Sequence, residues 1–263
     1  MTRKIRRTRD YEVVLEIKND DFIVPPRTAQ RNWLLNKTMA ELAYDLEALD
    51  EQAKRFVAGA TGAVQLEDRS NTVLDDDEIM EDWQIQLMKA MAEEVTSSHG
   101  DVLEIGFGRG IGSDFIQEFG VKSHTIVEVN DSVVERYHEW RKKYPDSEFK
   151  LLHGLWQDKV SDFEHYDGIF FHTYPLNEQD YVEQVVNSVT FAEHFFPTAS
   201  AHLKNGGVFS YMTNEIDSLS RAHQRLLFEY FSSFSLRIIK LDVPEDVQDT
   251  WWIDQMIVGR AVK

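Results

Sequence analysis

Two kinds of hydrophobic periodicity run along this chain. In residues 28–58 and 79–95 the apolar side chains recur at three- and four-residue steps, which predicts amphipathic helices. From residue 101 onward, short apolar runs alternate with helical segments, as in a parallel sheet that carries helices on both faces. The apolar runs predict strands at about residues 101–106, 124–129, 148–152, 167–173, 207–213, 234–242 and 252–260.

The pattern also indicates how the chain is organised. Val13–Ile17 predicts one further strand near the N-terminus, and Pro244-Glu245-Asp246 predicts the turn of a hairpin between the last two strands. We therefore expect an α/β, Rossmann-like fold with a seven-stranded, mostly parallel sheet, helices on both faces and an N-terminal helical cap. Residues 1–75 would form the cap, and residues 76–263 the ligand-binding domain.

The first predicted strand of the sheet runs into a glycine-rich turn. The glycines are Gly106, Gly108, Gly110 and Gly112. Because glycine has no Cβ, such a turn lets the backbone approach a ligand closely, with the next helix starting after it. Eighteen residues after Gly110, Glu128 ends the next apolar run, where an acid can accept hydrogen bonds from a ribose. The two features predict a nucleoside-bearing cofactor.

Glu104 decides which cofactor the turn favours. This acid leads into the turn, two residues before Gly106. A carboxylate at that place would repel a pyrophosphate, but it would attract a ligand that carries a positive charge. S-adenosylmethionine (SAM) has both a sulfonium and an α-amino group, so the sequence favours SAM over a dinucleotide.

Composition limits the remaining classes of function. The chain has 263 residues, 42% of them hydrophobic, which is enough for a core, and no apolar run long enough to span a membrane. The net charge of −18 disfavours nucleic acid as a partner. Without cysteine, and with nine scattered histidines, we expect no metal site, and the acid run Asp75–Glu78 reads as a solvated loop before a helix. A cytoplasmic location fits this composition.

Several motifs occur in a characteristic order through residues 79–263. They are Ile79–Gln84, Val102–Gly108, Glu128–Asp131, Gly154–Asp158, Tyr166–Ile169, Thr173–Leu176, Gly206–Val208 and Gln255–Ile257. In this order they resemble guanidinoacetate N-methyltransferase, and Gly-Leu-Trp-x-Asp and Thr-Tyr-Pro-Leu are the specific ones. The resemblance implies a class I SAM-dependent methyltransferase, and it does not reach residues 1–75.

The resemblance and the glycine turn together name the cofactor-binding candidates. They are Met80, Met88, Glu104, Gly106, Phe107, Gly108, Gly110, Ile111, Gly112, Glu128, Val129, Asn130, Trp156 and Gln157. The two methionines would pack on the adenine or the methylthio group, although they could equally be helix core. Trp156 and Gln157 follow the third strand, where the adenine edge should lie.

Two departures from the family bear on the substrate. The family holds its cationic guanidino group with two carboxylates, and the corresponding positions here are Gln84 and His172. A guanidinium needs counter-charges, so guanidinoacetate is not the expected acceptor. We predict Gln84, His172 and Tyr174 as catalytic residues, with a structural role as the alternative for His172. Further candidates for substrate contact are Phe22, Trp33, Asn214 and Glu215.

These features lead to one principal hypothesis and two alternatives. We expect a SAM-dependent methyltransferase that N-methylates a small molecule, amino-acid-like or N-heterocyclic, of the kind found in natural-product biosynthesis. One alternative is a SAM-consuming cyclase that releases methylthioadenosine and a cyclic amino acid. The other is a non-catalytic SAM-binding subunit. The N-terminal cap could also exchange between two copies and form a homodimer.

Overall fold

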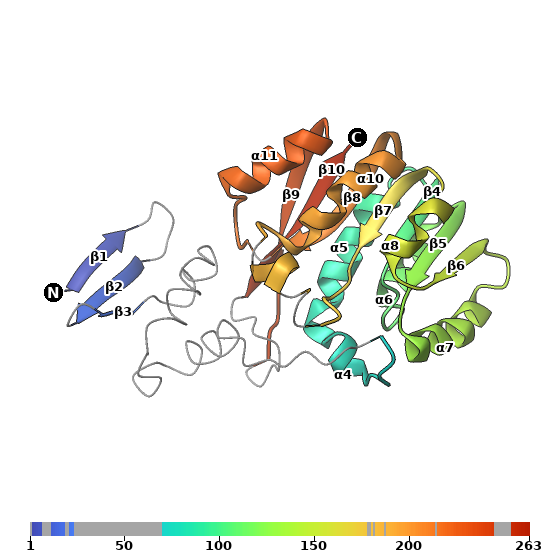
Figure 1. Cartoon of the computed structure of the whole chain (residues 1–263), viewed down its shortest axis with the longest axis horizontal. Helices are drawn as coiled ribbons and strands as arrows, with labels where there is room; N and C mark the ends of the chain where they lie inside the picture. Colours follow the sequence, from blue (N-terminus) through green and yellow to red (C-terminus); the bar gives the residue numbers. More distant parts are fainter. Residues whose placement is uncertain are drawn as a thin grey trace. The chain divides into compact units, whose positions relative to one another are not determined.

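The computed structural model describes most of the chain from residue 70 onward and three short strands near its start (Figure 1). The described residues are 2–6, 12–18, 21–23, 70–177, 180, 182–186, 188–213, 215–244 and 254–263. The chain divides into two compact units, residues 1–65 with 243–254 and residues 66–242 with 255–263. The expected helix at 28–58 lies outside the described residues, and the expected boundary at residue 75 stays a prediction.

The first unit contains a three-stranded antiparallel sheet in the order β1-β2-β3. Its strands are β1 (Thr2–Arg6), β2 (Glu12–Lys18) and β3 (Asp21–Ile23). The sequence predicted only the strand at 13–17, which lies within β2. The strand predicted there is confirmed, and β1 and β3, which the sequence did not indicate, pair with it. The basic start of the chain, taken alone, has no apolar alternation, and only pairing with β2 makes it a strand.

The second unit contains the predicted seven-stranded sheet, in the order β6-β5-β4-β7-β8-β10-β9. Its strands are β4 (Asp101–Ile105), β5 (Ser123–Glu128), β6 (Phe149–His153), β7 (Tyr166–Phe171), β8 (Leu203–Thr213), β9 (Ser233–Lys240) and β10 (Gln255–Val262). Strands β4 to β8 pair in parallel, whereas β10 pairs antiparallel with both β8 and β9. The sequence-based fold prediction is confirmed.

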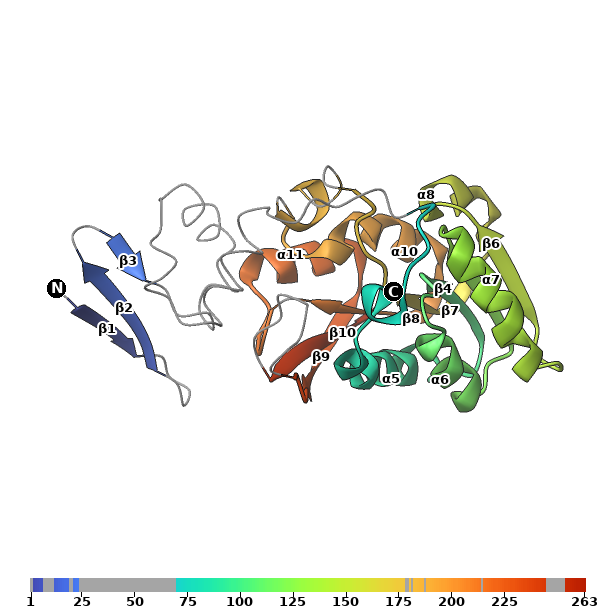
Figure 2. The same ribbon diagram turned by 90° about the horizontal axis from the view of Figure 1, so that it is seen from below.

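Helices cover both faces of this sheet. Figure 2 shows α5 and α6 on one face and α10 and α11 on the other. The α-helices are α4 (Asp76–Ile79), α5 (Ile85–Val95), α6 (Ile111–Phe119), α7 (Asp131–Trp140), α8 (Trp156–Lys159), α10 (Phe196–His202) and α11 (Arg221–Tyr230). The short 3-10 helices are η2 (Asp82–Gln84), η3 (Arg141–Lys143), η4 (Val160–Asp162) and η6 (Phe191–Phe195), and η5 (Val182–Val186) is a π-helix.

The segment before β4 differs from its sequence-based interpretation. The acid run at 75–78 was expected to be a loop, but Asp76–Ile79 forms the short helix α4. Glu78 Oε2 accepts a hydrogen bond of 2.7 Å from the backbone N–H of Asp75, which is half of a capping box. The helix expected from residue 79 is interrupted, because Met80 is extended and α5 starts only at Ile85.

Side chains that alternate along the central strands pack into two hydrophobic cores, one on each face of the sheet. Ile126 packs with Phe107, Tyr137 and Trp140 on the α7 side. Its neighbour Val127 points to the other face, into a core that includes the helices after β7. Because both faces are covered, the carboxyl ends of β4 to β7 are left as the place where a ligand can bind.

Candidate cofactor and acceptor site

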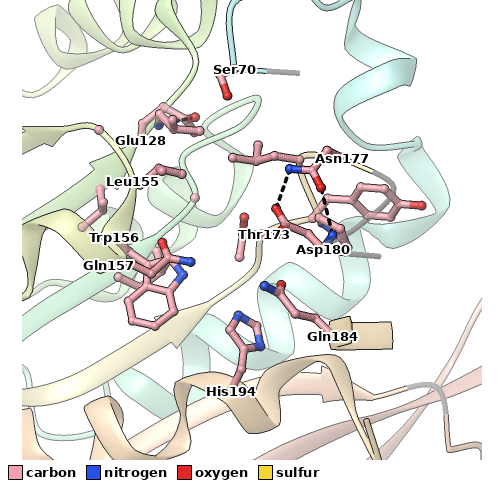
Figure 3. Close-up of a pocket in the computed structure, with 18 of the residues that line it drawn as sticks. Ser70, Glu128, Leu155, Trp156, Gln157, Thr173, Asn177, Asp180, Gln184 and His194 are labelled. Carbon is pink, nitrogen blue, oxygen red and sulfur yellow. Dashed lines mark hydrogen bonds between the residues drawn. The ribbon is translucent and has the colours of Figure 1, made fainter. Parts of the chain in front are cut away.

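A pocket of about 410 Å³ opens at the carboxyl ends of β4, β5, β6 and β7 (Figure 3). It is lined by Ser70, Ile105, Gly106, Val127, Glu128, Val129, Gly154, Leu155, Trp156, Gln157, Thr173, Tyr174, Pro175, Leu176, Asn177, Asp180, Gln184, Phe191 and His194. Five of these residues were predicted to bind the cofactor, and Tyr174 was predicted to act on the substrate. Their roles stay predictions, but the pocket brings them together.

The glycine turn packs directly against the end of β7. Gly106 has a φ of +90°, and a Cβ there would lie 2.1 Å from the carbonyl oxygen of His172. The backbone N–H of His172 donates to the carbonyl of Ile105 at 3.1 Å. Position 106 therefore requires glycine, which lets the turn pack against the end of β7 at the edge of the pocket.

Glu128 holds the turn in place. Its Oε2 accepts hydrogen bonds from the backbone N–H groups of Phe107 at 2.9 Å and Gly108 at 3.3 Å. Its Oε1 accepts from the N–H groups of Val129 at 2.8 Å and Asn130 at 2.9 Å. Glu128 is therefore both the acid that faces the pocket and the link between β5 and the glycine turn.

Trp156 and Gln157 lie at the start of α8 and line the pocket beside Leu155. The Trp156 ring meets Phe195 edge-on, with 4.9 Å between ring centroids. Leu155 is 36% exposed, so this rim of the pocket is both apolar and open. Such a rim suits the flat face of a purine.

Other predicted cofactor residues do not line the pocket. Met80 and Met88 are both buried; Met88 lies in α5, whereas Met80 lies in the extended backbone between α4 and η2. Phe107 packs edge-on against Tyr137 and Trp140, with ring centroids 5.5 and 5.3 Å away. The remaining predicted residues of this group that are absent from the lining are Glu104, Gly108, Gly110, Ile111, Gly112 and Asn130.

Glu104 and Asn130 have structural partners instead. Glu104 is 1% exposed, accepts a hydrogen bond from Ser113 Oγ and lies 3.0 Å from His124 Nε2. Asn130 Oδ1 caps α7 by accepting from the backbone N–H groups of Ser132 and Val133. Both residues were predicted as ligand contacts from the sequence. The sequence does not show toward which side of the turn each side chain points.

Gln84 and His172, the positions that depart from the family, carry no charge at neutral pH. Gln84 is buried at the end of η2. Burial lowers the pKa of His172 to about 4, so its imidazole is neutral at pH 7. Neither lines the pocket, whereas Tyr174 does and is 51% exposed.

Of the candidates for substrate contact, Glu215 is the one that lies in the described part of the ligand-binding unit. Glu215 Oε2 lies 2.8 Å from His223 Nδ1, and its Oε1 accepts from the backbone N–H of Ser220 at 2.6 Å. This carboxylate therefore fastens the loop before α11. Phe22 belongs to β3 in the other unit, and Trp33 and Asn214 lie outside the described residues.

The sequence did not single out the polar residues that follow β7. Asp180, Gln184 and His194 all line the pocket, and Figure 3 shows them on the side opposite Glu128 and Leu155. Asn177 orients Asp180, since its Nδ2 donates to Asp180 Oδ2 at 3.1 Å and its Oδ1 accepts from the backbone N–H of Asp180 at 2.9 Å. The sequence offered one indication of Asp180, Gln184 and His194: they follow the strand predicted at 167–173, whose end was expected to face the ligand.

Comparison with known proteins identifies the family. The family model described as guanidinoacetate N-methyltransferase matches residues 48–222. The chain belongs to this family. Its members are SAM-dependent methyltransferases, and the expected cofactor is confirmed.

Curated relatives are similar over part of the chain. Protein arginine N-methyltransferase 2 of Candida glabrata is 31% identical over 128 residues, covering 44% of this chain and 30% of that protein. The protein of the same name from Kluyveromyces lactis is 30% identical over 118 residues, covering 41% of this chain and 28% of its own length. The match thus spans less than a third of these relatives.

A solved structure supports the fold. Precorrin-6y C5,15-methyltransferase from Geobacter metallireducens GS-15 superposes with a TM-score of 0.50 and 14% identity, covering 73% of this chain and 97% of that one. At this identity the likeness concerns the fold alone. It agrees with the doubly covered, mostly parallel sheet described above.

The residues of the family's cofactor site fit SAM. Gly106 and Glu128 line the pocket, Leu155 and Trp156 form its apolar rim, and Gln157 adds a polar group beside them. Among the described residues, no cluster of histidine, aspartate or glutamate could hold a metal ion. None of the helices in the described part is long and apolar enough to span a membrane.

Proposed function

We propose that this protein transfers the methyl group of SAM to a nitrogen of a small molecule other than guanidinoacetate. The observation that carries the proposal is the absence of charge at positions 84 and 172. A guanidinium is charged at every pH that proteins tolerate, so it needs carboxylates when it is removed from water. Gln84 and the neutral His172 cannot supply them.

The cost of burying an unpaired charge is large enough to favour an uncharged acceptor group over a guanidinium at these positions. Leaving a buried charge without its partner costs on the order of 3–5 kcal/mol, which is at least a hundredfold in affinity. A neutral imidazole or amide can still accept or donate a single hydrogen bond. Neither position supplies the carboxylates with which the family holds a guanidinium, so we infer that other residues recognise the reacting nitrogen of the acceptor.

SAM supplies an electrophilic methyl group, and the chain contributes mainly by orientation. The glycine turn and Glu128 fix one side of the pocket, while Thr173 and Tyr174 at the end of β7 form another. Aligning an acceptor with its donor can contribute up to roughly 7–11 kcal/mol to the barrier. The apolar rim at Leu155 and Trp156 helps to exclude water from the same space.

A second acceptor deserves a test because of the curated relatives. They are named protein arginine N-methyltransferase 2, so an arginine side chain in a protein is the competing substrate. The uncharged residues at 84 and 172 argue against it for the same reason as against guanidinoacetate. We therefore rank it below a small-molecule acceptor.

The deciding experiment is mass spectrometry of the full chain with SAM, alone and with amines, N-heterocycles, guanidinoacetate and arginine peptides. We expect S-adenosylhomocysteine to form with amines or N-heterocycles and not with the two guanidines. Turnover of either guanidine at a comparable rate would refute the proposal. Methylthioadenosine formed from SAM alone would identify a cyclase, and no product with any acceptor would identify a binding subunit.

A further inference from the structure

The segment after β7 supplies half of the pocket, and this half is separate from the cofactor motifs (Figure 3). Its polar groups include Asp180 and His194. With Glu128, the lining contains two carboxylates, and among its described residues there is no lysine or arginine. The pocket therefore attracts cations, and its lining offers no cationic side chain to a carboxylate on the acceptor.

The Asp180 carboxylate keeps more capacity for a ligand than the Glu128 carboxylate does. A carboxylate can accept about four hydrogen bonds. Glu128 already accepts four from backbone N–H groups. Among the described residues, the Asp180 carboxylate accepts only from Asn177 Nδ2, at 3.1 Å. Asn177 thus orients this carboxylate and leaves its other positions for a donor in the pocket.

His194 presents a neutral acceptor on the same side. Its Nδ1 contacts the carbonyl oxygen of Phe191, which can only accept, so Nδ1 carries the hydrogen and Nε2 is the acceptor. Burial lowers the pKa of His194, although the Phe191 carbonyl and the charge of Asp180 oppose this. The rings of Trp156 and Phe171 hold the imidazole, with centroids 5.7 and 5.6 Å away.

We infer that Asp180 and His194 form the acceptor subsite and that the acceptor is a protonated amine without a carboxylate near its ammonium group. The Asp180 carboxylate would supply the counter-charge when the amine binds. Nε2 of His194 would take the proton that the ammonium must lose, so that the nitrogen lone pair can bond to the methyl carbon of SAM as S-adenosylhomocysteine leaves. The two residues determine specificity by binding the acceptor. The inference rests on the proposed function, because it names the class of molecule that receives the methyl group.

Binding to the full chain saturated with S-adenosylhomocysteine tests this inference without turnover. The probes are n-butylammonium, n-butanol and butyrate, which have chains of similar length and differ in charge. By calorimetry we expect the ammonium to bind more tightly than the other two. Asp180→Asn should weaken ammonium binding roughly tenfold to a hundredfold, the worth of a hydrogen bond to a charged group. Affinity for S-adenosylhomocysteine should stay within twofold.

Glu183→Gln is the matched control, because Glu183 is exposed on the same segment and does not line the pocket. It should leave the preference for ammonium unchanged. The inference is overturned if the three probes bind the wild-type chain equally. It is also overturned if the control weakens ammonium binding as much as Asp180→Asn does. The wild-type comparison decides the matter even if Asp180→Asn does not fold, and it is independent of whether any methyl transfer is detected.

Discussion

At the scale of the residue, two side-chain requirements shape the cofactor side of the pocket. Position 106 must be glycine, because its φ of +90° and the nearby His172 carbonyl leave no room for a Cβ. Position 128 must accept four N–H groups, which only a carboxylate does. Both requirements are visible in the sequence, since they follow from residue type at a fixed place in a strand–turn–helix unit.

Gly106→Ala is therefore expected to weaken cofactor binding strongly. Its Cβ would lie 2.1 Å from the His172 oxygen, so the turn must move away from β7. Gly120→Ala is the control, because Gly120 has a similar φ of +78° and nothing within 4 Å of its Cβ position. Calorimetry with S-adenosylhomocysteine should show at least a tenfold loss for Gly106→Ala and an unchanged affinity for Gly120→Ala. An equal loss of affinity in both variants would show that backbone strain at a positive φ, rather than the contact with β7, weakens cofactor binding.

At the scale of the element, three side chains from the glycine turn and from α7 and its N-cap form hydrogen bonds with the segment that contains α4 and η2. Asn130 Nδ2 donates to the carbonyl of Thr72 at 2.8 Å, and Arg136 donates to the carbonyl of Leu74 at 2.8 Å. Arg109, within the glycine turn, donates to the carbonyl of Met80 at 2.8 Å and to Asp82 at 2.7 Å. The acidic segment is therefore ordered by cations from the turn and from α7, although the sequence suggested a solvated loop.

Arg109→Met should loosen this segment without unfolding the sheet. The carbonyl of Met80 and the carboxylate of Asp82 would lose their partner, at a cost of about 1–3 kcal/mol. Hydrogen exchange should become faster for amides of residues 76–84, and S-adenosylhomocysteine should dissociate faster. Lys142→Met, which breaks the surface ion pair with Glu139 at 2.6 Å, should change neither quantity. Unchanged exchange in Arg109→Met would mean that packing alone holds the segment.

At the scale of the whole ligand-binding unit, one end of the sheet carries the pocket and the other carries an ion network. Lys204 of β8 lies 2.7 Å from Asp101 of β4 and 2.6 Å from Asp167 of β7. These strands are distant in sequence and start side by side. The hydrogen bond from Lys204 is the main reason why the pKa of Asp101 falls to about 2, and Asp101 and Asp167 raise the pKa of Lys204.

This network should make stability depend on pH at the acidic end. The folded pKa of Asp101 lies below its ordinary value of 3.8, so its contribution is complete above about pH 4 and is lost as the pH falls toward 2. Asp101→Asn should lower the free energy of unfolding by at most about 2 kcal/mol at pH 7, and by less at pH 3. Urea denaturation at both pH values measures the difference. A loss of equal size at pH 3 and pH 7 would show that the charge of Asp101 is not what stabilises the sheet.

The sequence alone determined the strands, the glycine turn and the acid that ends β5. Periodicity, backbone freedom and residue type are local properties, so each can be interpreted without knowing the neighbours in space. The first strands of the chain, β1 and β3, escaped notice because their apolar signal is weak and they form only by pairing with β2.

Only the tertiary structure decided which polar side chains reach the pocket. Glu104 and Asp180 have the same functional group, yet one is buried against Ser113 and His124 while the other lines the pocket. The difference depends on which face of a strand or loop packs against the rest of the chain. Burial and partners come from residues distant in sequence, and they also set the charge that His172 and His194 carry.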